Sequence, residues 1–363
     1  MSGIMKPWKP AKRRESVCYN GFAAPVKAGA VYLFLASILD EVYNMHIDTE
    51  EVQAMQNSYE HILELETTPE ALEATVKYLS ERLKPFLQTL EPVLICYPDE
   101  GPKSLGGVFK EAVLRCNANP VFWGPDYRWK ELLRTAFHSH ANTVVGHPLV
   151  VLGLMKLARA TSTPLYFFDV IVCGDPFSHW MVDDLKLGLD CKIWGCYAVR
   201  SGPVVAGFSC PQEAGIHIRE DVFAPHFPDQ PGSDTYASMR GRLYFQSVKD
   251  PSVVYDPMVQ ALVHYQSCSC GCDEPRVVET GSVRDDIRAR EVLEDKFLAW
   301  SSVLDYYSEN TESGMALELV VFPGESLPKV PSAAKLKIRP WNPDVDIPFC
   351  MRSYASKIAE KID

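Results

Sequence analysis

Four side chains with sulfur or imidazole groups have the types and the spacing of a metal site. Six residues separate Cys210 from His217, and a tight Cys-Ser-Cys-Gly-Cys run follows downstream. Thiolates this close repel one another unless a cation holds them, and three thiolates with one imidazole form a usual closed tetrahedral zinc site. We therefore predict a structural zinc ion. Its predicted ligands are Cys210, His217, Cys268 and Cys270, with Cys272 as a substitute. The alternative is two unrelated pairs of reduced cysteines in loops.

Glycines that follow apolar runs predict where a small molecule would bind. The apolar pair Ile193-Trp194 has the pattern of a strand end that Gly195 breaks, and an upstream strand ends at Gly174-Asp175-Pro176. Open α/β sheets bind ligands at the carboxyl ends of their strands. The residues predicted to face a ligand are His147, Gly174, Asp175, Trp194, Gly195 and Tyr197.

Each of these ligand-facing positions has a plainer alternative. Trp194 and Tyr197 would stack on an aromatic or flat acid. Core packing is the alternative for both, and Trp194 is equally compatible with either. His147 would be merely solvated in its loop. The sequence contains no G-x-S-x-G, no Walker-type loop and no G-x-G-x-x-G. The residues alone therefore indicate a crevice and a metal site without naming a reaction.

The elements that must position these residues alternate regularly between residues 92 and 195. Apolar runs predict strands at 92–97, 119–123, 143–145, 165–173 and 191–194. Amphipathic or apolar helical patterns separate them, which is typical of a parallel sheet flanked by helices.

We predict an α/β fold in three parts. Residues 1–220 form an α/β core with a mostly parallel sheet flanked by helices. Residues 221–280 form a small antiparallel β subdomain with the zinc knuckle. Residues 281–363 form a small α+β C-terminal unit, with a helix near 291–306 before its strands and a second helix at its end.

Composition limits the classes of partner. The 363-residue chain carries a formal net charge of −11, which argues against nucleic acid or an anionic membrane as its main partner. No apolar run reaches the roughly 20 residues that span a bilayer, and the basic start lacks the apolar stretch of a secretory signal. The eleven scattered cysteines fit reduced thiols. We expect a cytoplasmic protein with a small-molecule partner, and a homodimer stays open.

Several stretches, taken in order, resemble the phenylacetate–coenzyme A ligase branch of the adenylate-forming superfamily. Residues 172–176 stand in place of its Gly-Gly-Glu-Pro-like turn, and residues 194–198 in place of its aromatic-Gly-x-Ser/Thr-Glu motif. Residues 210–221 match a Cys…Gly-Leu-His-x-x-Glu-Asp segment, and residues 268–276 match a Cys-x-Cys-Gly knuckle followed by Pro-Arg. Residues 281–286 resemble the Gly…Asp-Asp hinge. The resemblance implies the fold of this superfamily and its reaction. Its enzymes use ATP to convert a carboxylic acid into an acyl-adenylate and then transfer the acyl group to coenzyme A.

The residues that would carry that chemistry depart from the family pattern. The phosphate loop expected at 16–27 has lost nearly all its hydroxyls and glycines, and Ala198 replaces the glutamate that would hold magnesium. Asp256 is adjacent to the position of the ribose-binding aspartate but out of register. Lys357 and Lys361 are only candidates for the catalytic lysine. These departures leave ATP, magnesium and coenzyme A open as cofactors.

Three functions follow as hypotheses, and whether the chain is an enzyme stays open. The first is a diverged ligase that binds an acyl or aryl carboxylate and activates it with ATP. The second is a repurposed acyl-transfer or condensing enzyme of a specialised biosynthetic pathway that no longer uses ATP. The third is a non-catalytic relative that binds a ligand. The acid, the acceptor and the oligomeric state are not encoded in any motif.

Overall fold

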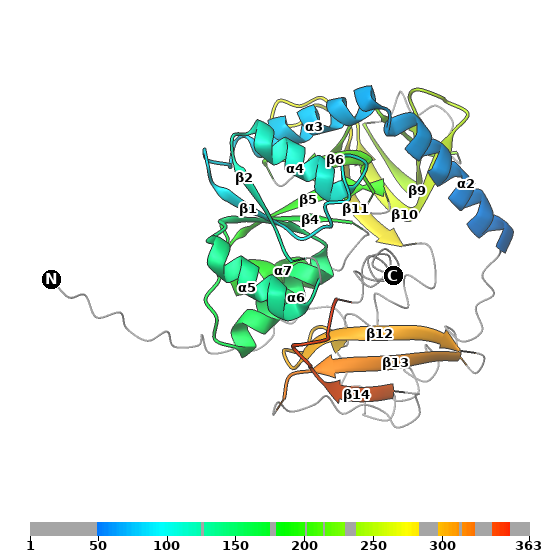
Figure 1. Cartoon of the computed structure of the whole chain (residues 1–363). Helices are drawn as coiled ribbons and strands as arrows, with labels where there is room; N and C mark the ends of the chain where they lie inside the picture. The colour runs from blue at the N-terminus through cyan, green and yellow to red at the C-terminus, as the bar shows by residue number, and fades with distance from the viewer. Residues whose placement is uncertain are drawn as a thin grey trace, which may run out of the picture.

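The computed structural model describes residues 49–124, 127–174, 179–199, 202–212, 215–228, 237–282, 297–311, 314–323 and 336–348. These residues form a large sheet with helices on both faces and a second, three-stranded sheet (Figure 1). The α/β class predicted from the sequence is confirmed. The described helices are each too short or too polar to cross a membrane.

The first half of the large sheet is parallel. Its elements in chain order are α2 (Thr49–Glu66), α3 (Pro69–Leu83), β1 (Pro92–Ile95), α4 (Leu105–Arg115), β2 (Asn119–Phe122), α5 (Trp129–Ser139), β3 (Thr143–Gly146), α6 (Pro148–Ala160), β4 (Asp169–Cys173), α7 (His179–Leu189) and β5 (Lys192–Ala198). The strands lie in the order β2-β1-β3-β4-β5, and each neighbouring pair is parallel. Parallel neighbours need a crossover connection, and helices provide it at each step between consecutive strands.

The second half of the same sheet is antiparallel. Its strands are β6 (Val205–Ser209), β7 (Ile216–Ile218), β8 (Phe223–His226), β9 (Ser238–Ser247), β10 (Val254–His264) and β11 (Arg276–Ser282). They continue from β5 in the order β6-β7-β11-β10-β9-β8. The boundary predicted at residue 220 lies between β7 and β8 of this continuous sheet.

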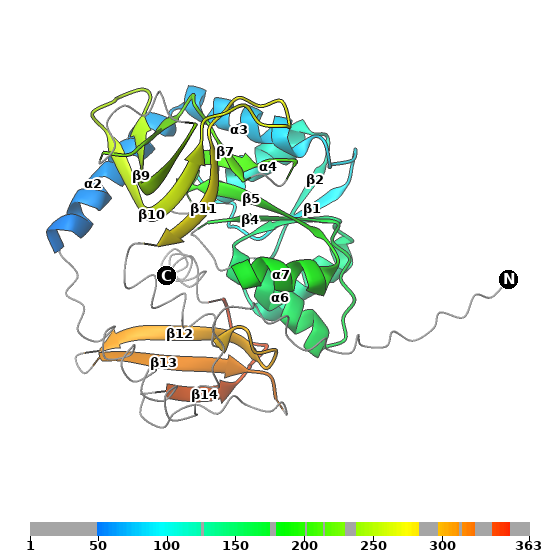
Figure 2. The same ribbon diagram turned by 180° about the vertical axis from the view of Figure 1, so that it is seen from behind.

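Side chains from alternate positions of the parallel strands fill two separate cores. Val170 and Val172 of β4 belong to the cluster under α5, α6 and α7. Ile171 and Cys173 point to the opposite face and belong to the cluster under α3 and α4. The period of two along a strand produces this division, and Figures 1 and 2 show the two helical layers on opposite sides of the sheet.

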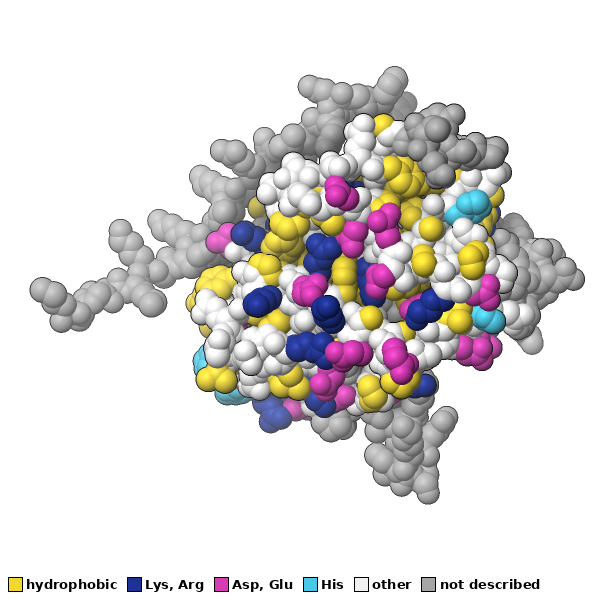
Figure 3. All heavy atoms as spheres, turned by 90° about the horizontal axis from the view of Figure 1, so that it is seen from above, with side chains coloured by type: hydrophobic (Ala, Val, Ile, Leu, Met, Phe, Trp, Pro, Cys, Tyr) yellow, Lys and Arg dark blue, Asp and Glu magenta, His cyan; other side chains and the backbone are white. Residues whose placement is uncertain are grey.

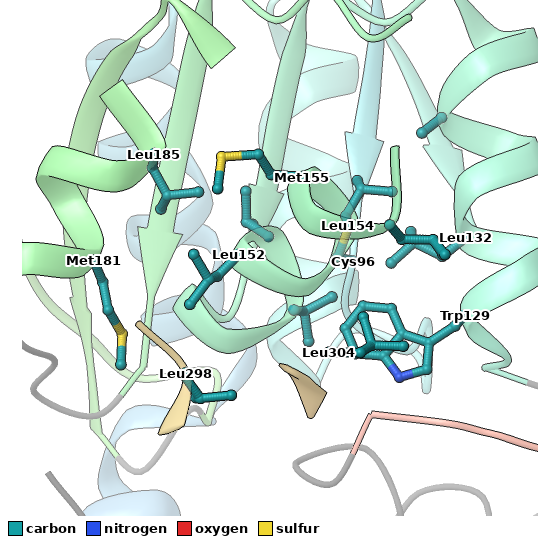
Figure 4. Close-up of a cluster of buried hydrophobic side chains, with 14 of the residues drawn as sticks. Cys96, Trp129, Leu132, Leu152, Leu154, Met155, Met181, Leu185, Leu298 and Leu304 are labelled. Carbon is teal, nitrogen blue, oxygen red and sulfur yellow. The ribbon is translucent and has the colours of Figure 1, made fainter. Parts of the chain in front are cut away.

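The three-stranded sheet packs against the α5–α6 layer. It contains β12 (Val303–Thr311) and β13 (Gly314–Val321), which are antiparallel, and β14 (Leu336–Pro340), which is parallel to β13. Leu298 and Leu304 lie in one buried cluster with Leu152 and Trp129 (Figure 4). We call residues 297–348, as far as they are described, the C-terminal unit.

Two sequence predictions about elements are corrected. Gly195 does not end its strand, because β5 continues through it to Ala198 and pairs with both β4 and β6. The helix predicted over 291–306 is wrong in its second part, where residues 303–306 begin β12. The run Val303-Leu-Asp-Tyr-Tyr307 is rich in β-branched and aromatic side chains, which favour a half-buried strand. The predicted final helix lies outside the described residues.

The face formed by α2 and α3 carries charges of both signs. Among the described side chains in Figure 3, lysines and arginines alternate with aspartates and glutamates instead of gathering by sign. The described side chains of this face therefore form no basic patch of the kind that a nucleic-acid backbone binds.

Candidate metal centre and ligand cavity

Sheet pairing brings the four predicted metal ligands together. Cys210 follows β6, His217 lies on β7, and the cysteine knuckle (residues 268–272) connects β10 to β11. Because β7 pairs with both β6 and β11, the knuckle is held beside Cys210. Cys210 Sγ lies 3.4 Å from Cys268 Sγ, and Cys270 Sγ lies 3.3 Å from His217 Nε2. All four ligand atoms lie within 4.8 Å of one another.

These distances fit a tetrahedral ion. Zinc bonds of about 2.3 Å to sulfur and 2.0–2.1 Å to nitrogen would place neighbouring ligand atoms about 3.5–3.8 Å apart. The two measured separations are shorter than this by a few tenths of an ångström, a difference that small side-chain rotations would remove. Two of the cysteines and the histidine are buried, and the fourth ligand is partly buried. The donor set therefore suits a closed site.

His217 is held in the tautomer that a metal requires. Its Nδ1 lies 3.2 Å from the backbone carbonyl of Glu274. A carbonyl only accepts, so Nδ1 donates its proton and leaves the lone pair of Nε2 facing Cys270. Burial lowers the pKa of His217, which favours the neutral imidazole.

The surroundings of the ligands favour a thiolate at Cys268, and Cys272 belongs with His217 and Glu274 to a second group of possible ligands. A hydrogen bond from the backbone amide of Cys270 lowers the pKa of Cys268 to about 7. Cys272 lies outside the four-residue group, with its Sγ 3.3 Å from Glu274 Oε2. Arg82 on α3 pairs with the same carboxylate at 2.6 Å, which fixes the knuckle to the helical layer.

A cavity of about 340 Å³ lies directly beside this candidate metal site, and Cys210 belongs to both. Its described lining comprises Val172, Val182, Lys186, Lys192, Ile193, Trp194, Gly195, Ser209, Cys210, Pro211, Gly215 and Ile216. The lining comes from the face of α7, the β4–β5 pair and the β6–β7 hairpin. Gly195 keeps the floor open, because a Cβ there would stand 3.2 Å from both Ile216 Cδ1 and Ser209 Oγ.

The predicted ligand-facing residues are divided between this cavity and other places. Trp194 and Gly195 line it. The Trp194 indole also stacks on Phe86, with ring centroids 5.2 Å apart, and donates to Asp169 over 2.7 Å. Tyr197 packs against Phe245 in the third core cluster.

His147 and Gly174 lie at the carboxyl ends of β3 and β4. The Nδ1 of His147 accepts the amide of Leu149 over 3.3 Å and caps the start of α6. Gly174 follows β4 with a φ of +134°, a conformation that favours glycine. Asp175 lies outside the described residues.

The positions expected to bind magnesium and nucleotide hold different chemistry. Ala198, in the place of the motif glutamate, is 3% exposed and packs in the cluster under α3 and α4. Asp256, beside the expected ribose site, forms an ion pair with Arg242 at 2.5 Å. The loop at 16–27, Lys357 and Lys361 lie outside the described residues.

Sequence reasoning missed the α7 side of the cavity. Val182 and Lys186 are four residues apart on α7 and so share a helical face, and Lys192 opens β5. The i, i+4 spacing was visible in the sequence. This spacing alone does not identify the residues that line a cavity, because the sequence does not show that this face of α7 packs against β5 instead of facing solvent.

Solved structures share this fold. No protein-family model matches the sequence, and no curated protein matches it. A 2-hydroxyisobutyryl-CoA ligase in the postadenylation state with R3-HIB-AMP matches at a TM-score of 0.51 and 14% identity, over 79% of this chain and 72% of that one. The same ligase with 2-HIB-AMP matches at 0.50 and 11% identity over the same shares. An open conformation with 2-HIB-AMP and CoA matches at 0.46 and 14% identity, over 57% of this chain and only 51% of that one. In its fold, the chain is similar to this 2-hydroxyisobutyryl-CoA ligase.

Proposed function

We propose that this protein binds a small organic acid, or the thioester of one, on an adenylate-forming ligase fold without performing the magnesium-dependent ATP step. The observation that carries the proposal is the buried methyl group of Ala198 at the end of β5. The resemblance calls for a carboxylate oxygen at this position, and magnesium binds only through oxygen ligands.

The residues that the structure describes do not fit a magnesium–ATP complex. Ala198 offers no ligand atom, and the Asp256 carboxylate, out of register, is engaged by Arg242. Stabilising the charge of a transferred phosphoryl group depends on such electrostatic contacts. We therefore derive no adenylation step for this chain.

We further propose that Cys210, His217, Cys268 and Cys270 hold a structural zinc ion. The ion would supply four bonds joining the β6–β7 hairpin to the knuckle, and no chemistry toward a substrate, because all four positions are filled by protein. The test is metal analysis of protein purified without added metal. One zinc per chain supports the proposal, and metal-free protein that is folded and thermally stable contradicts it.

The function is tested by isothermal titration calorimetry on the zinc-loaded chain. The panel contains magnesium–ATP, AMP, benzoate, phenylacetate, hexanoate and the coenzyme A thioesters of the three acids. We expect saturable heat with at least one acid or thioester and none with either nucleotide. Magnesium–ATP binding would contradict the proposal, and so would a complete absence of acid and thioester binding. Turnover of a thioester without ATP would identify an acyl-transfer enzyme among the binding outcomes.

A further inference from the structure

We propose that Cys272 and Glu274, together with His217, form an outer metal position through which the zinc ion enters and leaves its four-ligand site. The inference goes beyond the proposed binding of an acid and rests only on the proposed zinc ion. We call the four proposed zinc ligands the inner group, and we call His217, Cys272 and Glu274 the outer group.

The outer group has the donor atoms and the spacing of a metal position of its own. One ligand atom from each of its three residues lies within 4.8 Å of the other two, and Cys272 Sγ is 3.3 Å from Glu274 Oε2. Thiolate, imidazole and carboxylate groups all bind zinc, and a zinc ion with three protein ligands keeps a fourth position for water or an incoming ligand. An ion in the outer group is therefore open to exchange, unlike an ion with four protein ligands.

The two groups share His217, so they cannot be filled at the same time. A neutral imidazole has one lone pair on its two nitrogens, and it therefore binds one metal ion at a time. In the inner group, His217 Nε2 lies 3.3 Å from Cys270 Sγ. The inner and outer groups are therefore alternative positions for a single ion.

The outer group lies on the accessible side of the metal centre. Three of the inner ligands are buried, whereas the fourth, Cys270, is partly exposed, and so are Cys272 and Glu274. Gly271 joins the two partly exposed cysteines, and no described atom beyond its chain neighbours lies within 4 Å of where its Cβ would stand. An ion that leaves the buried ligands must therefore pass the outer group.

Arg82 makes the inner group the resting position of the ion. Its guanidinium lies 2.6 Å from Glu274 Oε2 and 4.0 Å from Cys272 Sγ. A positive charge this close repels a second cation placed between the same two side chains, whereas the inner group supplies three sulfur ligands. The ion therefore occupies the outer group only during entry and release.

Transfer from the inner to the outer group exchanges one thiolate for another. The Cys272 thiol gives its proton to solvent and its sulfur bonds to the ion, because only the deprotonated sulfur is a metal ligand. The bond between the ion and Cys270 breaks, and the Cys270 thiolate takes up a proton from solvent. The zinc ion stays divalent throughout, and a chelator then takes it from the outer group.

The test is the rate at which the zinc-loaded chain releases its ion to a chromogenic chelator. Cys272→Ser should still hold one zinc per chain before the chelator is added. It should release that zinc at least about tenfold more slowly, which corresponds to about 1.4 kcal/mol of activation free energy. The matched control is Cys116→Ser, which alters another partly buried free cysteine outside both groups and should leave the rate unchanged.

The direction of the change separates a role in exchange from a structural role. If Cys272 only supported the knuckle, Cys272→Ser would loosen the site and speed release. Release at the wild-type rate or faster would therefore overturn the inference, and so would loss of zinc from Cys272→Ser before the chelator is added. A wild-type chain that holds no zinc would overturn the zinc proposal together with this inference, and the acid-binding proposal would keep its own calorimetric test.

A second measurement detects the ion in the outer group directly. Cys270→Ser removes the partly exposed inner ligand, so the ion should move to the outer group and depend on Cys272. At equilibrium with a competing chelator, Cys270→Ser/Cys272→Ser should bind zinc at least about tenfold more weakly than the control Cys270→Ser/Cys116→Ser, because even the loss of an outer-shell partner costs about 10–100-fold in metal affinity. Equal affinity of the two double variants would overturn the outer position.

Discussion

At the scale of residues, two neighbouring cysteines lie differently toward the proposed metal site. Cys268 lies 3.4 Å from Cys210, whereas Cys272, four positions later, faces Glu274. The sequence made both plausible, because spacing along the knuckle does not determine which sulfur points inward. That choice depends on the turn at Gly271, whose φ is +84°, and on the hydrogen bond from the Cys268 amide to the Cys272 carbonyl.

We predict that Cys268→Ser and Cys272→Ser differ in zinc content. Cys268→Ser removes a thiolate ligand, so the chain should retain well under one zinc after dialysis and should melt at a lower temperature, because metal affinity is folding free energy in such sites. Cys272→Ser should retain one zinc. The measurement is elemental analysis with parallel melting curves. Equal zinc loss in the two variants would show that Cys272 replaces one of the four ligands.

At the scale of elements, helix α6 is anchored to the C-terminal unit by one buried lysine. Lys156 is 4% exposed. Its ammonium donates to the carbonyls of Leu298, of Trp300 over 3.3 Å and of Val303 over 2.8 Å. Burial lowers the pKa of Lys156 to about 7, although Asp184 opposes the shift. An unfolded lysine has a pKa of about 10.4.

Because the pKa of Lys156 is lowered in the folded protein, we predict that the free energy of unfolding depends on pH. Between about pH 7 and pH 10 the unfolded chain holds the proton that the folded chain has released, so the free energy of unfolding rises with pH in this window. Lys156→Met removes that contribution together with the hydrogen bonds to the three carbonyls, so we expect a loss of about 2–4 kcal/mol that grows from pH 7 to pH 9.5. The measurement is urea unfolding of both proteins at both pH values.

The exposed lysine of a surface ion pair is the control for this prediction. Lys130 pairs with Asp344 at 3.0 Å, and Lys130→Met should cost under about 1 kcal/mol with no change across the same pH window. A Lys156→Met difference that is constant or shrinks with pH would contradict the assigned direction of the pKa shift.

Element prediction from the sequence succeeded where local signals and tertiary packing agree. The helical pattern between the predicted strands at 143–145 and 165–173 is α6 (Pro148–Ala160), because Pro148 at its first position and a buried apolar run specify it locally. The predicted strand ended too early, at Gly195, because a glycine is typical of a strand end. In the structure the missing side chain of Gly195 allows Ile216 and Ser209 to approach β5. The β12 strand was mistaken for helix, since its burial against α6 is set by residues distant in sequence.

At the scale of the whole molecule, the C-terminal unit and the α5–α7 layer share one core. Leu304, Tyr306 and Leu319 belong to the same buried cluster as Trp129 and Leu152. Leu304, Trp129 and Leu152 are labelled in Figure 4. At the edge of this contact, the amide of Trp129 donates to the carbonyl of Asp346 over 3.0 Å. The sequence predicted a separate small unit at this end of the chain but carried no signal of the shared core.

A shared core predicts cooperative unfolding. We expect a single calorimetric transition for the zinc-loaded chain, because exposing the C-terminal unit would also expose the apolar face of α6. Leu304→Ala should lower the midpoint by removing a fully buried side chain, at a cost of about 2–5 kcal/mol, and the transition should stay single. A separate low-temperature transition that Leu304→Ala shifts alone would show that the unit unfolds independently.

The proposed function requires that the protein keeps a ligase-like fold but does not perform the magnesium–ATP step. The most direct measurement is acid-dependent exchange of labelled pyrophosphate into ATP by the zinc-loaded chain, with an acid that calorimetry has shown to bind. We predict no exchange above the rate without protein, because Ala198 supplies no oxygen for magnesium. Exchange that requires both the acid and magnesium would contradict the account and identify the protein as a working carboxylate-activating ligase.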